Sequence, residues 1–447
     1  MTEKSGNHFS AKRVNVIGGG LAGSECAAFL SKAGAEVHLF EQKPVNFSPA
    51  HKSENFAELV CSNSLKSDDA AGNACGLLKE EMRRLDSVTM AAAEEARVAG
   101  GAALTVDRDK FSASVTQKLK QLPIIFHAER VDDLEGEAFR SAINVVCTGP
   151  LTSENFSDYL GKKTGTPLYF FDASAPIVAA ESIDMAQAFF GDRYGDGTGD
   201  YLNCPLEKAD YDAFYKALVT AETATLKDFE NDKVFDGCMP VEVMAKRGGD
   251  TLRYGPLKPV GLSFQAGRKL YACLQLRPED ENKTMYNLVG FQTNLKFPEQ
   301  KRVFSMIPAL KNAEFLRYGV MHKNIYLRSP ELLSYDQSLV SDPDLFFAGQ
   351  ITGVEGYVES AASGILAGVQ VLRRLQGKPP IDFPAETVIG ALSHYVVRKN
   401  VDFQPMNANY GIVRPVYGFD HDKKAKKAAI KERSLSLIEK IKEQIYE

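Results

Sequence analysis

Apolar positions in the first part of the chain predict strands that alternate with helices. Residues 13–17 and 36–40 are apolar runs of the length of buried strands, and the stretch between them, about 23–33, has the spacing of a helix. Gly34 follows this stretch at a position where glycine commonly ends a helix. A strand, a helix and a second strand in this order are typical of the α/β class with a parallel sheet.

The same pattern continues after residue 70 and returns near the end of the chain. Residues 70–100 carry apolar side chains at helical spacing, and residues 143–149 form an apolar run that ends in glycine. Residues 345–348 predict a last parallel strand, which is closed by Gly349 and followed by a long apolar helix over about 358–376. We therefore expect a Rossmann-like sheet that a late segment of the chain completes.

The middle of the chain mixes helical and strand-like stretches and predicts a second domain. We interpret about 151–334 as an inserted mixed α/β domain, and residues 1–150 with about 335–447 as the Rossmann-like domain. The last stretch, 423–447, predicts a helix whose charges indicate a solvent-exposed face in preference to an RNA contact. The stretches that define the middle segment are a helix over 208–224 and strands over 270–276 and 286–291.

A glycine-rich turn lies between the first strand and the first helix. Residues 14–25 read VNVIGGGLAGSE, so that Gly18, Gly20 and Gly23 fit the GxGxxG pattern. The first glycine permits a tight turn, the second lets the backbone approach a pyrophosphate, and the third lets the helix pack closely on the strand. The N–H groups at the helix start favour phosphate. Glu41 ends the next strand, where a carboxylate accepts hydrogen bonds from a ribose diol.

A late segment favours FAD over NAD as the dinucleotide. Residues 344–353, DLFFAGQITG, would return the chain to the sheet through a strand and Gly349, as in many flavoproteins. An acidic residue often follows this glycine, whereas this chain has Gln350, which indicates a particular subgroup. NAD remains the alternative. The predicted cofactor-binding residues are Gly18, Gly19, Gly20, Leu21, Ala22, Gly23, Glu41, Gly349 and Gln350.

Composition agrees with a globular protein. The 447 residues are 44% hydrophobic and 25% charged, and the net charge of −5 gives no support for nucleic-acid binding by overall charge. The sequence has no apolar stretch near the roughly 18 residues of a membrane span, and its first residues lack the apolar core of a signal peptide. We therefore expect a cytoplasmic protein that does not use a membrane.

Seven cysteines are spread widely along the chain, without a CxxC pair or a Cys/His cluster. We expect no metal site, and free thiols that are mostly buried. One or two of them are candidates for nucleophiles.

Several segments resemble the TrmFO family, the folate-dependent, flavin-containing RNA uracil-C5 methyltransferases. The resemblance spans almost the whole chain in order, and its central segment, 237–262, is the most specific. A larger flavoprotein family shares the segment around FFAGQ, and the length of this chain favours the methyltransferases. The matching segments are VIGGGLAGSECA (16–27), ELVCSNSLKSD (58–68), LLKEEMRRL (77–85), GGAALTVDR (100–108), YLNCP (201–205), GCMPVEVMAKRGGDTLRYGPLKPVGL (237–262), YNLVGFQTNL (286–295), FLRYGVMHKN (315–324), FFAGQITGVEGYVESAASGILAG (346–368) and FQPMNANYGI (403–412).

The resemblance implies an activity and its partners. Family members take a methylene from 5,10-methylenetetrahydrofolate, use reduced FAD to carry it, and use NAD(P)H to reload the flavin. The product is usually 5-methyluridine at uridine 54 of the tRNA T loop, and some members methylate ribosomal RNA instead. The implied partners are therefore RNA, folate and NAD(P)H, with FAD as cofactor.

Two cysteines match functional positions of the family. Cys238 corresponds to the nucleophile toward C6 of uracil, in the inserted domain, and Cys61 to a second cysteine near the flavin. Uracil C5 is a poor nucleophile, and a thiolate that adds to C6 makes C5 electron-rich. Cysteine suits this step because it adds and leaves readily. Cys61 would protect or activate the flavin–methylene adduct, or assist proton removal.

Aromatic and basic residues in the shared segments are candidates for base stacking and for binding RNA phosphates or the folate tail. Core packing and solvent-exposed charge are the alternative interpretations. The aromatic candidates are Tyr254, Phe291, Tyr318 and Tyr357, and the basic ones are Arg83, Arg84, Lys246, Arg247, Arg253, Lys258, Lys296 and Arg317.

Three other functions stay open at this point. The same chemistry on a ribosomal RNA uridine is one, a flavin oxidoreductase of a small molecule is the second, and a non-catalytic RNA-binding role is the third. Methylation assays on purified RNAs separate all three.

Overall fold

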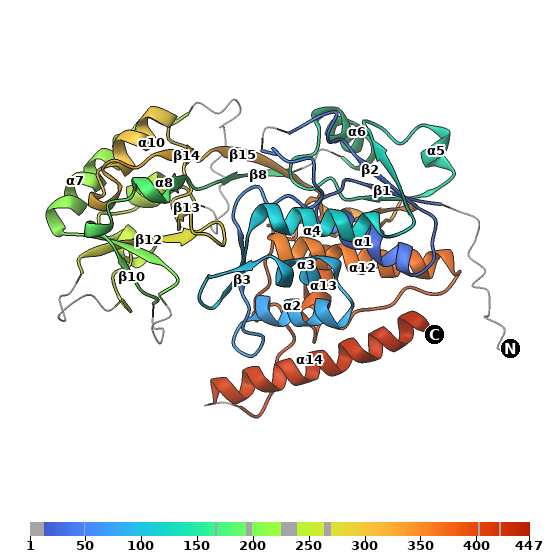
Figure 1. Ribbon diagram of the computed structural model, residues 1–447. Coiled ribbons are helices and arrows are strands. Elements are labelled where there is room, and N and C mark those ends of the chain that lie inside the picture. The colour runs from blue at the N-terminus through green and yellow to red at the C-terminus, as the bar shows by residue number, and fades with distance from the viewer. Residues whose placement is uncertain are drawn as a thin grey trace.

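The computed structural model describes residues 13–48, 50–165, 168–193, 199–224, 239–262, 270–400, 403–419 and 422–447. These residues form two lobes, each built on a six-stranded sheet. The lobes are connected by a ribbon of two antiparallel strands, β8 (Leu168–Ala173) and β15 (Met321–Tyr326) (Figure 1). The chain therefore enters and leaves the second lobe side by side.

The first lobe contains the parallel sheet that the sequence predicts. Its strand order is β16-β17-β7-β1-β2-β6, and every neighbouring pair is parallel except the edge pair β16–β17. The late strand β17 pairs with β7, so a distant segment completes the sheet as expected. This α/β arrangement confirms the predicted Rossmann-like fold class. The strands are β1 (Val14–Ile17), β2 (Val37–Glu41), β6 (Ile124–Ala128), β7 (Ile143–Val146), β16 (Ser338–Leu339) and β17 (Asp342–Phe347).

Helices α1 (Leu21–Lys32) and α12 (Tyr357–Leu375) pack against each other beside this sheet (Figure 1). Glycines on α12 permit the close approach, because a Cβ at Gly364 would lie 2.1 Å from the carbonyl oxygen of Ala22. A Cβ at Gly368 would lie 2.9 Å from the ring of Phe29. The start of α1 is therefore fixed by backbone contact with a helix more than 300 residues later in the chain.

The helical stretch predicted over 70–100 is interrupted. Helix α2 (Ala74–Arg84) ends before Asp86, which has a left-handed φ of 58°, and α3 (Val88–Glu95) begins after Ser87, which caps it. The buried carboxylate of Glu25 on α1 accepts hydrogen bonds from two N–H groups at the start of α3. The helical spacing of apolar residues on both sides conceals this break. Other elements of the first lobe are β3 (Ser64–Ser67), β4 (Arg97–Val98), β5 (Ala103–Val106), α4 (Arg108–Lys120), α5 (Glu137–Arg140), α6 (Glu154–Thr164), α11 (Ser329–Leu332) and α13 (Val388–Val397).

The second lobe is an antiparallel sheet in the order β10-β11-β12-β13-β9-β14, covered by helices. Phe291 lies in its core, with ring centroids 6.0 Å from Phe214 and 5.2 Å from Phe304. Its elements are β9 (Ile177–Ala179), β10 (Phe189–Phe190), β11 (Leu202–Leu206), α7 (Lys208–Val219), α8 (Val241–Lys246), α9 (Thr251–Tyr254), β12 (Ala272–Pro278), β13 (Met285–Leu288), α10 (Phe297–Phe304) and β14 (Phe315–Arg317).

Helix α6 bears on the division into domains. Its buried residues Phe156 and Leu160 share a core cluster with Phe40 of β2 and Phe347 of β17, so the helix packs with the first sheet. We propose that the inserted part begins after α6 and ends where β15 returns to the first lobe.

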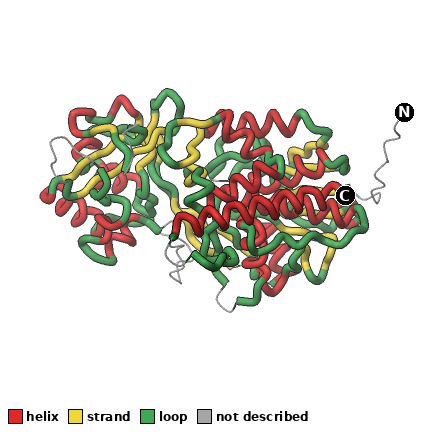
Figure 2. The backbone as a smooth tube through the Cα atoms, turned by 90° about the horizontal axis from the view of Figure 1, so that it is seen from below, coloured by secondary structure: helices red, strands yellow, loops and turns green. Residues whose placement is uncertain are grey.

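The C-terminal helix α14 (Lys423–Tyr446) lies below α2 in Figure 1, and Figure 2 shows it from below as the long helix that ends at the C-terminus. One side of the helix is buried against the first lobe and the remaining positions are largely exposed, which agrees with the predicted solvent-exposed face. The buried side consists of Ile430, Ser434, Ile438, Ile441 and Ile445.

A buried carboxylate joins three helices at this contact. Glu81 on α2 accepts hydrogen bonds from the N–H groups of Val388 (2.8 Å) and Ile389 (2.9 Å) at the start of α13, and from the hydroxyl of Ser434 on α14 (2.5 Å). Burial raises the pKa of Glu81 to about 7, although these three donors act in the opposite direction. The protonated form is therefore favoured in the folded state relative to the unfolded chain.

This shift predicts a pH-dependent stability. The contribution of Glu81 to the free energy of unfolding is fully present below its ordinary pKa of 4.5 and is lost as the pH rises through about 7. At about 1.4 kcal/mol per pH unit, the loss is about 3 kcal/mol. We expect urea unfolding at pH 5 and at pH 8 to show this difference for the wild type, beyond the pH dependence of Glu81→Gln. Equal pH dependence in the two proteins would contradict the assignment.

Candidate cofactor and thiol site

The glycine turn between β1 and α1 needs glycine for steric reasons. Gly18 has φ of +103°, and a Cβ there would lie 2.6 Å from the carbonyl oxygen of Cys147. A Cβ at Gly23 would lie 1.8 Å from the carbonyl oxygen of Gly18, and one at Gly19 would lie 2.5 Å from the ring of Phe56. These three glycines let the turn, α1 and the neighbouring strand end pack against one another.

Gly20 is different, because a Cβ built on it has no heavy atom within 4 Å. It is the N-cap residue of α1, and the first N–H groups of a helix have no partner within the helix. Open space at this position therefore lies where the positive end of the helix can bind an anion.

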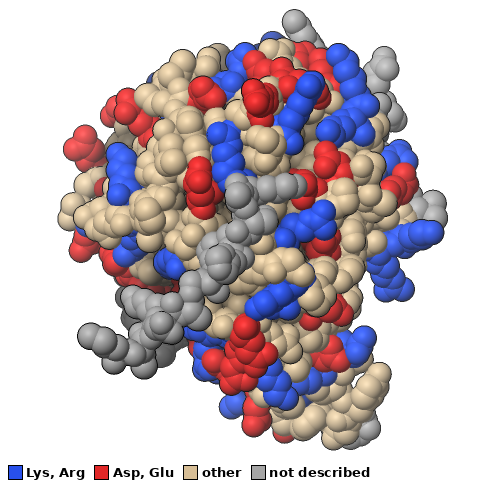
Figure 3. All heavy atoms as spheres, turned by 90° about the vertical axis from the view of Figure 1, so that its right-hand side faces the viewer, with Lys and Arg blue, Asp and Glu red and all other residues tan. Residues whose placement is uncertain are grey.

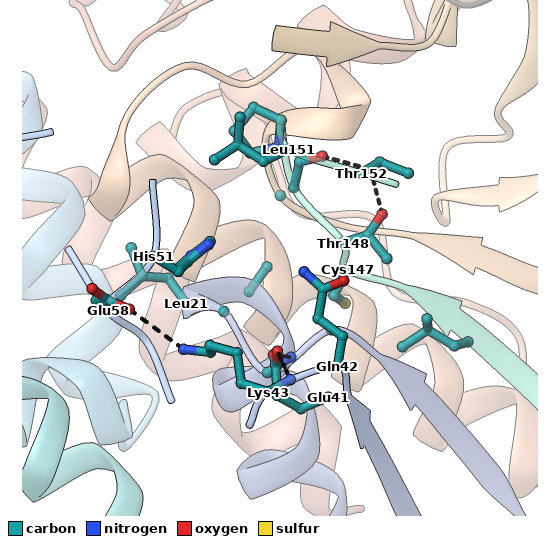
Figure 4. A pocket seen from close by; sticks show the side chains of 18 of the residues that line it. Leu21, Glu41, Gln42, Lys43, His51, Glu58, Cys147, Thr148, Leu151 and Thr152 are labelled. Carbon is teal, nitrogen blue, oxygen red and sulfur yellow. Dashed lines mark hydrogen bonds and ion pairs between the residues drawn. The ribbon is translucent and has the colours of Figure 1, made fainter. Parts of the chain in front are cut away.

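A pocket with about 1070 Å³ of empty space opens over this turn (Figure 4). It is lined by the carboxyl end of the parallel sheet, as expected for a ligand site in this fold. Gly23 is not among the lining residues and serves packing instead. The predicted cofactor residues that line the pocket are Gly18, Gly19, Gly20, Leu21, Ala22, Glu41, Gly349 and Gln350.

Glu41 lies at the end of β2 and bends back toward the turn. One carboxylate oxygen accepts a hydrogen bond from the N–H of Gly19 (2.8 Å), and the other accepts one from the N–H of Lys43 (3.0 Å). Each oxygen can accept a second hydrogen bond, so the group can still bind a diol.

The segment 349–353 follows the last parallel strand at the same pocket. Gly349 has φ of +85°, and its N–H donates to the hydroxyl of Ser363 at 2.6 Å. The amide of Gln350 donates to Glu355 at 2.8 Å. The residue after the glycine thus has its amide oriented by a carboxylate five residues later.

Sequence reasoning missed a second group of lining residues, in the loop after β2. Lys43 lies 3.6 Å from the carboxylate of Glu58 (Figure 4), and Nδ1 of His51 lies 2.6 Å from the hydroxyl of Ser48. Burial lowers the pKa of His51, and the charge of Lys43 lowers it further, so the neutral imidazole is favoured. The sequence indicated a role for Lys43 and His51 only through their position between Glu41 and the segment that carries Cys61.

Cys61 lies in a loop that three arginines hold. Arg108 donates to the carbonyl oxygens of Leu59 (3.0 Å) and Cys61 (3.4 Å), and Arg317 donates to that of Val60 (2.6 Å). We call residues 59–63 the Cys61 loop.

The same loop is held at its other end and from the backbone. Arg277 donates to the side chains of Ser62 (2.7 Å) and Asn63 (2.9 Å). The phenol oxygen of Tyr357 accepts hydrogen bonds from the N–H groups of Cys61 (2.6 Å) and Ser62 (3.1 Å). Every residue of the Cys61 loop therefore accepts a hydrogen bond from an arginine.

These contacts come from both lobes. Arg108 is the first residue of α4, whereas Arg277 and Arg317 lie on β12 and β14 of the second sheet. Arg108 also donates to the buried carboxylate of Glu279 at 2.6 Å, across the junction. Because Val60 and Tyr357 line the pocket, the Cys61 loop borders it where the lobes meet.

Cys61 is half-buried, whereas the other five described cysteines are buried. Burial raises the pKa of each of these five thiols, for Cys273 to about 12, so they remain neutral and unreactive. The expectation that most cysteines are buried is confirmed for the described residues. Cys238 lies outside them.

Other candidates from the sequence have different surroundings. Tyr254 is 86% exposed and Tyr318 stacks between Phe297 and Phe315, while Phe291 is a core residue and Tyr357 contacts the Cys61 loop. Four basic candidates, Arg83, Arg84, Arg253 and Lys296, form ion pairs within the protein, and Arg317 holds the Cys61 loop.

Metal-binding clusters and membrane-spanning helices are two further features to consider among the described residues. No three or more His, Cys, Asp and Glu side chains are grouped there so that they could hold a metal ion. Among the same residues, no helix has both the length and the apolar character needed to cross a membrane.

The fold is similar to solved structures of GidA from Aquifex aeolicus. One crystal form superposes with a TM-score of 0.70 at 16% identity, covering 99% of this chain and 74% of that one. The other gives a TM-score of 0.69 at 17% identity, covering 97% and 79%. At such identities the likeness shows the fold alone.

Sequence comparison gives a closer relationship. The family model described as glucose inhibited division protein A matches residues 13–379. A protein of Caldicellulosiruptor bescii named methylenetetrahydrofolate–tRNA-(uracil-5-)-methyltransferase TrmFO is 52% identical over 97% of this chain and 99% of its own length. One of the same name from Acetivibrio thermocellus is 53% identical over 95% of this chain and 97% of its own length. The chain therefore belongs to the TrmFO family.

Proposed function

We propose that this protein transfers a methylene group from 5,10-methylenetetrahydrofolate to C5 of a uridine in RNA, with reduced FAD as cofactor, and so forms 5-methyluridine. The preferred target is uridine 54 in the T loop of tRNA. The observation that carries the proposal is the position of the Cys61 loop, which places a half-buried thiol at the edge of the pocket over the glycine turn. Relatives about half identical to this chain carry the name of this activity.

The residues present fit FAD. The open space at Gly20 and the start of α1 suit a diphosphate, and Glu41 suits a ribose diol. Gly349 and Gln350, which line the same pocket, would help to hold the flavin. When bound, reduced FAD supplies the methylene carrier and the reducing electrons, and NAD(P)H restores it.

The two thiols are proposed to act on the base. Cys238 adds to C6 of uracil as a thiolate and leaves after the methyl group has formed. Cys61 is close enough to the pocket to take up the C5 proton or to protect the site from water. Cys61 is the one half-buried thiol among the six described cysteines, which agrees with a chemical task for it.

RNA would approach from the side of the lobe junction. Figure 3 shows the far end of the first lobe, where Lys and Arg alternate with Asp and Glu and create no field of one sign. By contrast, three arginines and one carboxylate meet at the Cys61 loop. The field of this excess positive charge would favour the approach of RNA phosphates to the junction, whereas the guanidinium groups themselves contact the Cys61 loop.

One experiment tests this function. The purified protein is incubated with labelled methylenetetrahydrofolate, NADPH and unmodified tRNA, and the label is sought in 5-methyluridine. We expect label in tRNA, at a single T-loop uridine. Parallel reactions contain ribosomal RNA or no RNA. Label in ribosomal RNA alone would show that the substrate is ribosomal RNA and not tRNA. NADPH oxidation without label in any RNA would favour an oxidoreductase of a small molecule.

A further inference from the structure

The Cys61 loop is surrounded by more positive than negative charge. The guanidinium groups of Arg108, Arg277 and Arg317 contact it, and the carboxylate of Glu279 pairs with Arg108. The side chain of Glu279 is 2% exposed and that of Arg108 is 15% exposed. Burial of unbalanced charge is costly, so such a cluster favours an additional anion nearby.

The arginines themselves respond to this imbalance. Burial lowers the pKa of Arg317, and the charge of Arg108 lowers it further. Burial also lowers the pKa of Arg277. A negative charge on Cys61 acts in the opposite direction on all three arginines. A thiolate at Cys61 would relieve this repulsion.

We propose that Arg108, Arg277 and Arg317 are positioning residues that fix the Cys61 loop between the lobes and favour the thiolate form of Cys61. The inference deepens the proposed function, because a thiolate at this place is what proton removal or protection of the flavin adduct would use. None of the three needs to touch the RNA or the folate.

Among the described residues, the charged and titratable groups around Cys61 and its arginines come from four elements and one turn. They are Arg108 on α4, Arg277 on β12, Glu279 directly after β12, Arg317 on β14 and Tyr357 on α12. Burial raises the pKa of Tyr357, so this phenol stays neutral and adds no charge. Tyr201, which faces Arg277, also has its pKa raised by burial. Glu279 is therefore the one carboxylate among these groups, against three guanidinium groups.

The test measures the reactivity of Cys61 in the flavin-loaded protein. Alkylation by iodoacetamide is followed from pH 5 to pH 10, and the peptide that contains Cys61 is quantified by mass spectrometry, so other thiols do not interfere. We expect a midpoint about one pH unit or more below the ordinary cysteine pKa of about 8.5. A midpoint at or above about 8.5 in the wild type overturns the proposal.

Two glutamine variants test whether the charges of Arg108 and Arg317 lower the midpoint of alkylation. Arg108→Gln and Arg317→Gln should each raise the midpoint by about one pH unit. Arg317→Lys, which keeps the charge, should restore most of the shift. The matched control is Arg302→Gln on α10, which removes a half-exposed arginine of the second lobe that pairs with Glu299. It should leave the midpoint unchanged.

The readout separates charge from loop geometry. A purely structural role would change the limiting alkylation rate at high pH and leave the midpoint in place. Unchanged midpoints in both glutamine variants, or an equal rise in Arg302→Gln, overturn the proposal. Because alkylation needs neither folate nor RNA, the result is independent of whether the proposed methylation takes place.

Discussion

Cys238→Ala should lower the rate of 5-methyluridine formation by about 10³-fold or more, since a covalent route is lost when its nucleophile is removed. Cys61→Ala should produce a loss of similar size if its thiol takes part in the same cycle. Both variants should remain yellow, because neither residue belongs to the glycine turn or to the strand ends that form the pocket over it. The measurement is label incorporation into tRNA under single-turnover conditions, beside the flavin spectrum.

The matched control is Cys273→Ala. Cys273 is fully buried in the second sheet, and its thiol stays neutral because burial raises its pKa to about 12. We expect full methylation by this variant, at some cost in thermal stability from the lost packing. Wild-type methylation rates in Cys238→Ala would exclude the assigned nucleophile. A reduced methylation rate in Cys273→Ala would show that the chemical role had been assigned to the wrong cysteine.

Gly20→Val should strongly weaken FAD binding and leave the fold intact. The backbone of Gly20 has φ of −72° and ψ of −168°, which other residues adopt readily, and the added side chain meets open space. That space is where the diphosphate would contact the helix N–H groups. Loss of two such charge-assisted hydrogen bonds costs about 3–6 kcal/mol, or roughly 10²–10⁴-fold in affinity. Titration of the apoprotein with FAD, followed by flavin fluorescence, measures this.

Gly23→Ala provides the contrast. A Cβ at Gly23 would lie 1.8 Å from the carbonyl oxygen of Gly18, so this change should destabilise the protein itself. We expect a lower melting temperature for Gly23→Ala and an unchanged one for the Gly20→Val apoprotein. If Gly20→Val binds FAD as the wild type does, the diphosphate does not lie over this turn.

Local rules explain why the glycine turn could be predicted from the sequence. Gly18 and Gly23 are required by contacts within a few residues or with the adjacent strand, and Gly20 lies in open space at the start of the helix, so the GxGxxG pattern alone predicts the turn. The return of residues 342–347 to the sheet was also predictable, because an apolar strand followed by glycine and a long helix is recognisable alone.

The surroundings of Cys61 could not be predicted in this way. The sequence predicted for Arg317 only a contact with RNA or folate. In the structure Arg317 donates to the carbonyl oxygen of Val60, 257 residues earlier in the chain. Arg108 and Arg277 gave no signal, since charged residues within strands and at helix starts are ordinary. The break at Asp86 was hidden for a related reason, because it depends on Glu25 from another helix. Long-range hydrogen bonds leave no periodicity in a sequence.

The chain enters and leaves the second lobe through the ribbon of β8 and β15. A short hairpin in place of the whole module could close the chain without disturbing the parallel sheet or the glycine turn. Such a truncated protein would keep the diphosphate cradle and lose two of the three guanidinium clamps on the Cys61 loop. The set of arginines around the Cys61 loop is therefore complete only when both halves are present in one polypeptide.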